Sequence, residues 1–245
     1  MKLILTSFLF VIIAIANGQS IKYLENDPVW KVNRSYGPCV SGREYNYFLS
    51  GDTLINNKTY KKVFSKGYTF GLNNPSSSCP TYYNIFVDNT PIAYLRQDNK
   101  KIYCIYSNCL TKKEILLYNF DLKINDTVKF YESCDTNNFI TAIVKTIDSI
   151  IVDNNYRKVF NLENINCKTE NSLSIIIEGI GSNHDLFKLC DNYSEGNFLT
   201  CFGFNGKTMY STNGIQYNLD VTMQFQDRPL GNQGSYFYKS PVKNK

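Results

Sequence analysis

Apolar and polar residues alternate along much of this chain, and no window of a dozen residues repeats apolar positions at helical spacing. The clearest run is Tyr118–Asn125, which reads Tyr-Asn-Phe-Asp-Leu-Lys-Ile-Asn and has the period of a half-buried strand. Asn125-Asp126 is then expected to turn the chain into a second strand over 127–131. The pattern predicts an all-β fold: a single antiparallel, meander-rich domain that forms a barrel or a sandwich.

Similar short runs predict further strands, and polar dipeptides predict the turns between them. Aromatic residues make up 15% of the chain, which fits strands because large flat side chains pack well on a pleated sheet. The strands are expected at 91–96, 101–106, 139–147, 173–178 and 197–204. The turns are expected at Asp98-Asn99, Asp153-Asn154, Asn205-Gly206 and Asn213-Gly214.

One hairpin sequence occurs twice. Residues Asp52–Phe64 match Asp148–Phe160 without a gap, and each copy has a β-branched arm, an Asn-containing turn and an arm with Tyr and Phe. The offset of 96 residues is too long for a solenoid. It indicates either duplicated halves or one hairpin used at two places in a continuous sheet, and we favour the second interpretation.

The first 18 residues are typical of a secretory signal peptide. Met1-Lys2 precedes an apolar run that ends in Ala16-Asn17-Gly18, and this run is shorter than the roughly 20 residues that cross a bilayer. Cleavage after Gly18 predicts a secreted, extracellular protein with no membrane span in the mature chain. We expect the β domain over residues 19–215 and a C-terminal extension, loosely ordered, over 216–245.

All eight cysteines follow the predicted cleavage point. Export to an oxidising compartment favours up to four disulfides among them, whereas no C-x-x-C pair and only one histidine are present for a metal site. We therefore predict no metal and no cofactor. The pairing expected from proximity along the chain is Cys104–Cys109 and Cys190–Cys201, with Cys39–Cys79 and Cys134–Cys167 for the rest.

Residues 178–185 gather the only candidates for catalysis. Glu178, Ser182, His184 and Asp185 combine acid, hydroxyl and imidazole, but close neighbours in one loop rarely converge as a nucleophile, base and orienting group. Gly179 and Gly181 fit a bulge or a tight exit from a buried strand. This structural interpretation is the favoured one, and it leaves His184 as an exposed loop residue.

Several motifs occur in an order that points to a known family. They include Trp30, the Asp52–Ile55 start of the first hairpin, the strand sequence Leu116–Leu122 and the turn sequence Glu178–Ser182. In these the chain resembles secreted proteins of unassigned function that often carry a type IX secretion sorting tail. The resemblance implies an exported β protein and little chemistry. The chain departs from that family after Gln216, where no sorting tail follows.

These patterns favour a secreted, non-enzymatic binding or structural protein with an unknown extracellular or cell-surface partner. A net charge of +5 without a dense basic block does not indicate nucleic acid as that partner. Two alternatives stay open. One is a lipocalin-like carrier of a small apolar ligand, and the other is a hydrolase that uses carboxylates or the Ser182/His184 region.

Overall fold

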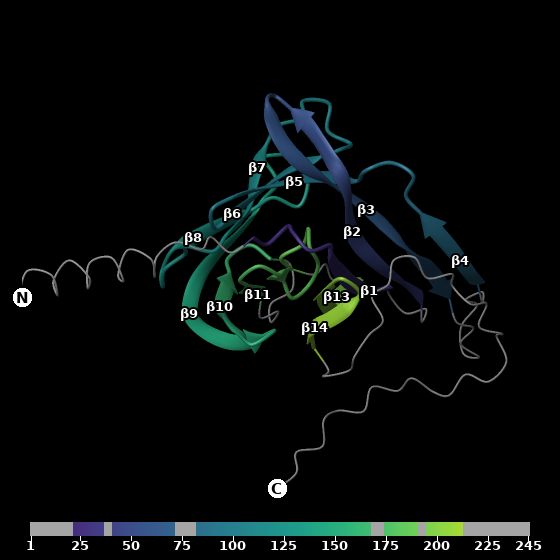
Figure 1. Cartoon of the computed structure of the whole chain (residues 1–245). Coiled ribbons are helices and arrows are strands. Elements are labelled where there is room, and N and C mark those ends of the chain that lie inside the picture. Colours follow the sequence, from purple (N-terminus) through teal and green to yellow (C-terminus); the bar gives the residue numbers. More distant parts are fainter. Residues whose placement is uncertain (1–21, 37–40, 72–81, 168–173, 191–194, 213–245) are drawn as a thin grey trace, which may run out of the picture.

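The computed structural model describes residues 22–36, 41–71, 82–167, 174–190 and 195–212. These residues form strands and turns without a helix, and the strands make two curled antiparallel sheets, each a half-barrel (Figure 1). The predicted all-β fold is confirmed. The described residues contain no helix that is long and apolar enough to cross a membrane.

The first sheet has nine strands among the described residues and contains both the earliest and the latest strands of the chain. Its spatial order is β14-β13-β1-β2-β3-β5-β6-β7, and β4 pairs with the outer half of β3. The strands are β1 (Pro28–Tyr36), β2 (Ser41–Ile55), β3 (Lys58–Gly71), β4 (Tyr82–Val87), β5 (Ala93–Asp98), β6 (Lys101–Tyr106), β7 (Ile115–Asn119), β13 (Glu195–Phe204) and β14 (Lys207–Ser211).

The second sheet has five strands in the described part of the chain, in the order β12-β11-β10-β9-β8. They are β8 (Thr127–Phe130), β9 (Ile140–Val152), β10 (Asn155–Asn164), β11 (Ser174–Ile177) and β12 (Gly181–Ser182). Buried side chains from both sheets belong to one hydrophobic cluster. The two half-barrels therefore share a single core.

The hairpin turns use residues that tolerate a left-handed backbone. Asn56-Asn57 closes β2–β3 and Asp153-Asn154 closes β9–β10, and all four residues have φ between 49° and 60°. Two consecutive positive φ values give the turn twist that matches the twist of the flanking strands. Asn205-Gly206 turns β13 into β14 in the same way. These predicted turns are confirmed, while Asn213-Gly214 lies outside the described residues.

The two copies of the repeated sequence form hairpins in different sheets. The first is β2–β3 in the larger sheet and the second is β9–β10 in the smaller one, so the interpretation of one continuous sheet is wrong. Each second arm pairs with a following antiparallel strand, and that strand pairs with the next. The shared unit is thus a row of four antiparallel strands, β2-β3-β5-β6 in one sheet, where β4 intervenes in the chain, and β9-β10-β11-β12 in the other.

Matching residues of the two hairpins are not buried alike. Tyr60 is 2% exposed, whereas its counterpart Tyr156 is 75% exposed. The two-residue turn falls one position later in the second copy, and β11 ends at Ile177, which pairs with Val159. The tip of β9–β10 therefore extends beyond its neighbouring strand, and Tyr156 lies in solvent.

The run with the strictest alternation is only partly a strand. β7 ends at Asn119, and turns follow before β8 begins at Thr127, so the strand predicted over Tyr118–Asn125 is wrong from Phe120 onward. Phe120 and Leu122 are still buried while Asp121 between them is exposed. The alternation therefore indicates which side chains are buried in the core. Side chains can be buried in this pattern outside a strand, where the backbone makes no hydrogen bonds to a neighbouring strand.

Residues 178–190, here called the inner loop, lie inside the molecule. Eleven of these thirteen residues are buried, and Ile180, Leu186, Phe187 and Leu189 belong to the shared hydrophobic cluster. In Figure 1 this segment follows β11 near the centre of the molecule. A β-rich interior between two curled sheets is filled here by a loop.

The cysteines pair differently from the prediction. Disulfides join Cys109 to Cys134, with Cα atoms 5.7 Å apart, and Cys167 to Cys190, at 6.3 Å. The predicted Cys104–Cys109, Cys190–Cys201 and Cys134–Cys167 pairs are therefore wrong, and the predicted pair Cys39–Cys79 lies outside the described residues.

The reason for this correction is the position of two cysteines inside strands. Cys104 in β6 lies between Leu95 and Ile115 and faces the core, and it is fully buried as a free thiol. Cys201 in β13 is buried with Val29 in a small cluster separate from the one that contains the inner loop, and Cys190 is bonded to Cys167 instead. Neither thiol can reach the partner that short chain separation suggested.

The predicted signal peptide, residues 1–18, and the predicted extension, residues 216–245, lie outside the described residues. The strands that the structure describes begin at Pro28 and end at Ser211.

Candidate functional site

The four candidate catalytic residues all lie on the inner loop. Glu178, Ser182, His184 and Asp185 are each at most 4% exposed. The expectation that His184 is an exposed loop residue is therefore wrong. It assumed that a Gly-rich polar segment runs over the surface, whereas this one packs between the sheets.

Two glycines allow the chain to enter and leave this interior position. Gly179 has φ +76° and Gly181 has φ +109°, which side chains other than glycine rarely adopt. A Cβ atom at Gly179 would lie 2.5 Å from a ring carbon of Tyr23, and one at Gly181 would lie 2.9 Å from the Tyr118 hydroxyl. The predicted role of these glycines, a tight exit from a buried strand, is confirmed.

The candidate residues enter separate hydrogen bonds. Ser182 Oγ accepts a hydrogen bond of 3.1 Å from the backbone N–H of His184. Asp185 Oδ1 accepts one of 2.9 Å from the backbone N–H of Phe187. The Ser182 hydroxyl and the Asp185 carboxylate are thus both engaged with backbone N–H groups of the inner loop itself.

Asp185 is the acceptor for two tyrosines from the opposite sheet. Its Oδ2 accepts hydrogen bonds from Tyr45, at 2.8 Å, and from Tyr47, at 3.3 Å, both on β2. Burial raises the pKa of the Asp185 carboxyl, and the hydrogen bonds from Phe187 and the two tyrosines oppose that shift. Burial and the nearby Asp185 carboxylate also raise the pKa of Tyr45 and of Tyr47. The two tyrosines thus keep their protons as donors.

Glu178 is tied down at the start of the loop. Its Oε1 accepts a hydrogen bond of 3.0 Å from the Tyr23 hydroxyl and lies 3.5 Å from Lys100 Nζ, while its Oε2 accepts one of 3.2 Å from the backbone N–H of Lys158. Each carboxylate oxygen therefore has a structural partner. A buried carboxylate needs such partners to offset its loss of hydration. The arrangement therefore fits a structural role for Glu178 and not that of a catalytic acid, which must contact a substrate.

Aromatic side chains of the larger sheet also hold the backbone of the inner loop. Trp30 Nε1 donates to the Ile180 carbonyl at 2.7 Å, and the Tyr118 hydroxyl donates to the Leu186 carbonyl at 2.7 Å. The same Tyr118 hydroxyl accepts from the backbone N–H of Ser182 at 3.1 Å. A buried loop needs partners for its peptide groups, and these long side chains with polar tips supply them.

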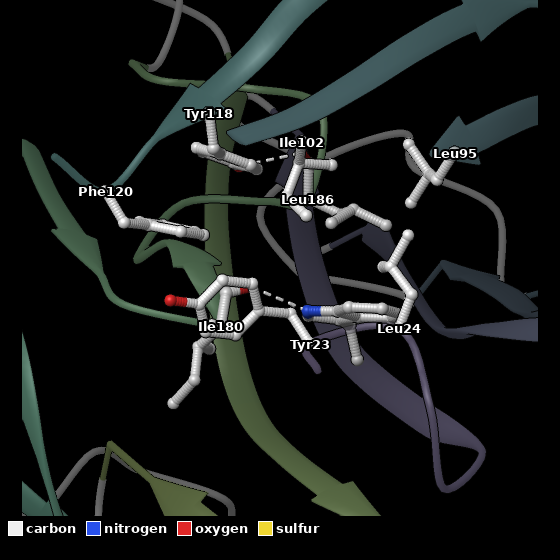
Figure 2. A pocket seen from close by; sticks show the side chains of 10 residues that line it. Tyr23, Leu24, Leu95, Ile102, Tyr118, Phe120, Ile180 and Leu186 are labelled. Atoms are coloured by element: carbon white, nitrogen blue, oxygen red, sulfur yellow. Dashed lines mark hydrogen bonds between the residues drawn. The ribbon is translucent and has the colours of Figure 1, made fainter. Parts of the chain in front are cut away.

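A small cavity lies where the inner loop meets β1, β5 and β6. Figure 2 shows its lining with the hydrogen bonds from Trp30 to Ile180 and from Tyr118 to Leu186 dashed. Its volume is about 10 Å³, enough for one water molecule. A small-molecule pocket needs at least ~300 Å³, so this cavity is not the ligand space of a carrier. Its lining residues are Tyr23, Leu24, Trp30, Leu95, Ile102, Tyr118, Phe120, Gly179, Ile180 and Leu186.

A cluster of charged residues lies at the surface beside β3 and β5. Glu114 accepts hydrogen bonds from Arg96 Nε at 2.9 Å, Lys58 Nζ at 2.8 Å and the Tyr60 hydroxyl at 2.5 Å. Burial alone would raise the pKa of Glu114, but these three donors together lower it to about 2. The Arg96 guanidinium also lies 4.5 Å from the centre of the Tyr103 ring. The carboxylate is fully paired, which fits a structural clamp between strands.

Exposed apolar side chains gather instead on the face of β3 and β4 that points away from the core. Tyr83, Ile85 and Val87 alternate along β4 and are 47%, 49% and 50% exposed. Their cross-strand neighbours on β3 are Phe70, Tyr68 and Lys66, which share the same face. Phe86, which lies between Ile85 and Val87, points to the opposite face of the sheet and contacts Tyr45 of the core. We call Tyr68, Phe70, Tyr83, Ile85 and Val87 the outer apolar patch.

The sequence patterns described above identify neither the tyrosines that bind the inner loop nor the outer apolar patch. The alternation Glu44-Tyr45-Asn46-Tyr47 could have marked two tyrosines on a buried face. The run Tyr82–Val87, six uncharged residues after a Pro/Ser-rich segment, could have marked an apolar edge strand. In both cases the sequence carries the strand pattern but not the identity of the facing residues.

No group of histidine, cysteine or acidic side chains that could hold a metal ion is found among the described residues. Comparison of the chain with models of protein families, with curated proteins and with solved structures finds no match to any of them.

Proposed function

We propose that this protein is an exported, disulfide-stabilised binding protein without catalytic activity, and that it contacts its partner through the outer apolar patch. The observation that carries the proposal is the exposure of three alternating apolar side chains, Tyr83, Ile85 and Val87, on one strand. Contiguous apolar surface of this kind typically marks an interaction site. Aromatic residues are also enriched in the centres of interfaces.

Two further observations support this proposal. The four residues with catalytic potential are buried and engaged in hydrogen bonds within the fold. The Cys109–Cys134 and Cys167–Cys190 pairs are consistent with an oxidising environment such as the exterior of the cell. Export itself rests on the predicted signal peptide, residues 1–18.

The test is a binding screen with purified protein that begins after residue 18. Arrays of immobilised glycans and of extended synthetic peptides serve as probes, and each is read with the unmodified protein and with Tyr68→Ala, Ile85→Ser and Ser182→Ala. We expect saturable binding to one probe class, weakened at least about tenfold by Tyr68→Ala or Ile85→Ser, because a hot-spot truncation costs more than about 1.4 kcal/mol.

Ser182→Ala is the matched control, since it removes a buried hydroxyl of the inner loop and leaves the surface unchanged. Binding that ignores both patch substitutions would contradict the proposed surface. Hydrolysis of a chromogenic ester or glycoside that is lost in Ser182→Ala or Asp185→Asn would contradict the absence of catalysis.

A further inference from the structure

The strand that carries the outer apolar patch lies at an edge of the larger sheet. Among the described strands, β4 pairs with β3 alone. Edge strands present a row of backbone donors and acceptors that can pair with another strand. Most edge strands in natural proteins are protected by charged residues, by proline or by a covering segment.

The direction of the backbone groups of β4 follows from one hydrogen bond. The backbone N–H of Asp88 donates to the Ser65 carbonyl at 2.9 Å, so position 88 points its peptide groups towards β3. Residues two apart along an antiparallel strand point their peptide groups the same way, and intervening residues point them the opposite way. Asn84 and Phe86 therefore face β3, whereas Ile85 and Val87 direct their N–H and C=O groups to the outer edge.

This edge lacks the charged residues found at two other edges that the structure describes. Tyr82–Val87 contains no charged residue, proline or glycine. By contrast, β14 begins with Lys207 and β8 contains Lys129. An uncharged strand of high β-propensity that has no described neighbour on its outer edge is suited to pairing with a further strand.

We propose that this further strand is β4 of a second copy of the chain, paired antiparallel across a two-fold axis at Ile85. A two-fold interface brings the same surface of each copy together, so the strand must be complementary to itself. Here Ile85 lies opposite Ile85 of the second copy, and Val87 lies opposite Tyr83. Every opposed pair on this face is apolar, and the neutral strand meets no like-charge repulsion.

This pairing extends the sheet, and each face of the sheet continues from one copy into the other. A two-fold axis perpendicular to the sheet places the outer apolar patches of both copies on the same side. The dimer therefore presents one doubled surface to a partner. A strand of six residues is about 20 Å long, which makes the contact smaller than a standard interface and the dimer weak and concentration-dependent.

The experiment is sedimentation equilibrium of the protein without residues 1–18, at concentrations from about 1 to about 200 µM, a range that brackets micromolar affinity. We expect a reversible monomer–dimer equilibrium. Ile85→Pro removes an N–H that points away from β3, and Ile85→Lys adds a charge at the two-fold axis. Both should weaken the dimer at least about tenfold, as expected for the loss of a central contact. Far-UV circular dichroism shows whether each variant is folded.

Leu54→Lys is the matched control, because Leu54 is 67% exposed but lies near the tip of the β2–β3 hairpin, away from β4. It should leave the dimer unchanged. A protein that stays monomeric over the whole range, or a dimer that survives Ile85→Lys, overturns the proposal. A monomer that binds extended peptides at Ile85 also overturns it and keeps the proposed binding function, so the two failures are distinguishable.

Discussion

At the scale of single residues, the hydrogen bonds of the inner loop show why tyrosine is so abundant in this chain. Tyr45, Tyr47 and Tyr118 each place an apolar ring in the core and a hydroxyl on a polar group of the loop. A leucine could fill the same space, but it would leave Asp185 and the loop carbonyls without donors. Each such group that is buried without a partner costs roughly 1–3 kcal/mol of stability.

Asp185 should therefore be the most sensitive polar residue of the loop. Asp185→Ala leaves two tyrosine hydroxyls and the Phe187 N–H without an acceptor, and we expect a loss of about 2–4 kcal/mol in the free energy of unfolding. Ser182→Ala removes one acceptor, for a loss of about 1 kcal/mol. Urea-induced unfolding, followed by tyrosine fluorescence, measures both.

The pH dependence of the same residue has a defined sign. Since burial raises the pKa of Asp185, the folded protein binds this proton more tightly than the unfolded chain does. Its contribution to stability is full below the unfolded-state pKa, about 4, and is lost as the pH rises through the raised folded-state pKa. The difference between wild type and Asp185→Asn should follow this course.

An Asp185→Ala loss of unfolding free energy below that of Ser182→Ala would contradict the assigned role of Asp185 as the main acceptor of the inner loop.

At the scale of elements, the repeated hairpin shows how one local sequence is used in two surroundings. Both copies form a two-residue turn with positive φ and the same row of four antiparallel strands. The neighbouring strands differ: Tyr60 contacts Glu114 next to β5, and Tyr156 extends past the end of β11. Local sequence therefore specifies the hairpin, while the length of the third strand decides which of its residues are buried.

The tight exit from β11 should depend on glycine for two separable reasons. Gly179→Ala combines a positive φ with a Cβ atom 2.5 Å from the Tyr23 ring, whereas Gly206→Ala has the same φ of +76° and open space around its Cβ atom. We expect Gly206→Ala to cost about 1 kcal/mol from backbone strain alone. Gly179→Ala should cost about 1–3 kcal/mol more, because the ring must shift.

Thermal unfolding of the two glycine variants gives the comparison directly. A melting temperature that falls equally in both would mean that Tyr23 moves aside freely. In that case its hydrogen bond to Glu178 would not hold the entrance of the inner loop.

At the scale of the whole molecule, disulfides join parts that are distant in the sheet order. Cys109 follows β6 of the larger sheet, and Cys134 follows β8 of the smaller one, so their bond links the two half-barrels. The second bond holds Cys190, the last residue of the inner loop, to Cys167 after β10. The first bond thus links the two sheets, and the second fixes the end of the inner loop to the smaller sheet.

Removal of the disulfide between the sheets should destabilise the fold without exposing the buried thiols of Cys104 and Cys201. We expect Cys109→Ser with Cys134→Ser to lose about 3 kcal/mol of unfolding free energy, the entropy of a loop of 25 residues. In the native protein, alkylation and peptide mapping should find Cys104 and Cys201 unmodified, because both are buried. Burial also raises the pKa of Cys201 to about 12.

Cys104→Ala is the control for this experiment, since it changes a buried cysteine that forms no disulfide in the described structure. A peptide that links Cys104 to Cys109 would contradict the pairing and would restore the one expected from chain proximity.

The sequence by itself determined the all-β class, the hairpin turns and the role of the two glycines. These depend on local properties, namely the period of two along a strand and the backbone freedom of Asn and Gly. Only the tertiary structure decided that the loop with Ser182, His184 and Asp185 lies inside, that Cys109 pairs with Cys134, and that Val87 and Ile85 line an edge where no further described strand pairs. Each of these depends on contacts between distant parts of the chain, such as Tyr45 with Asp185 across 140 positions. Such contacts are set by the packing of whole sheets, which no local pattern of residues encodes.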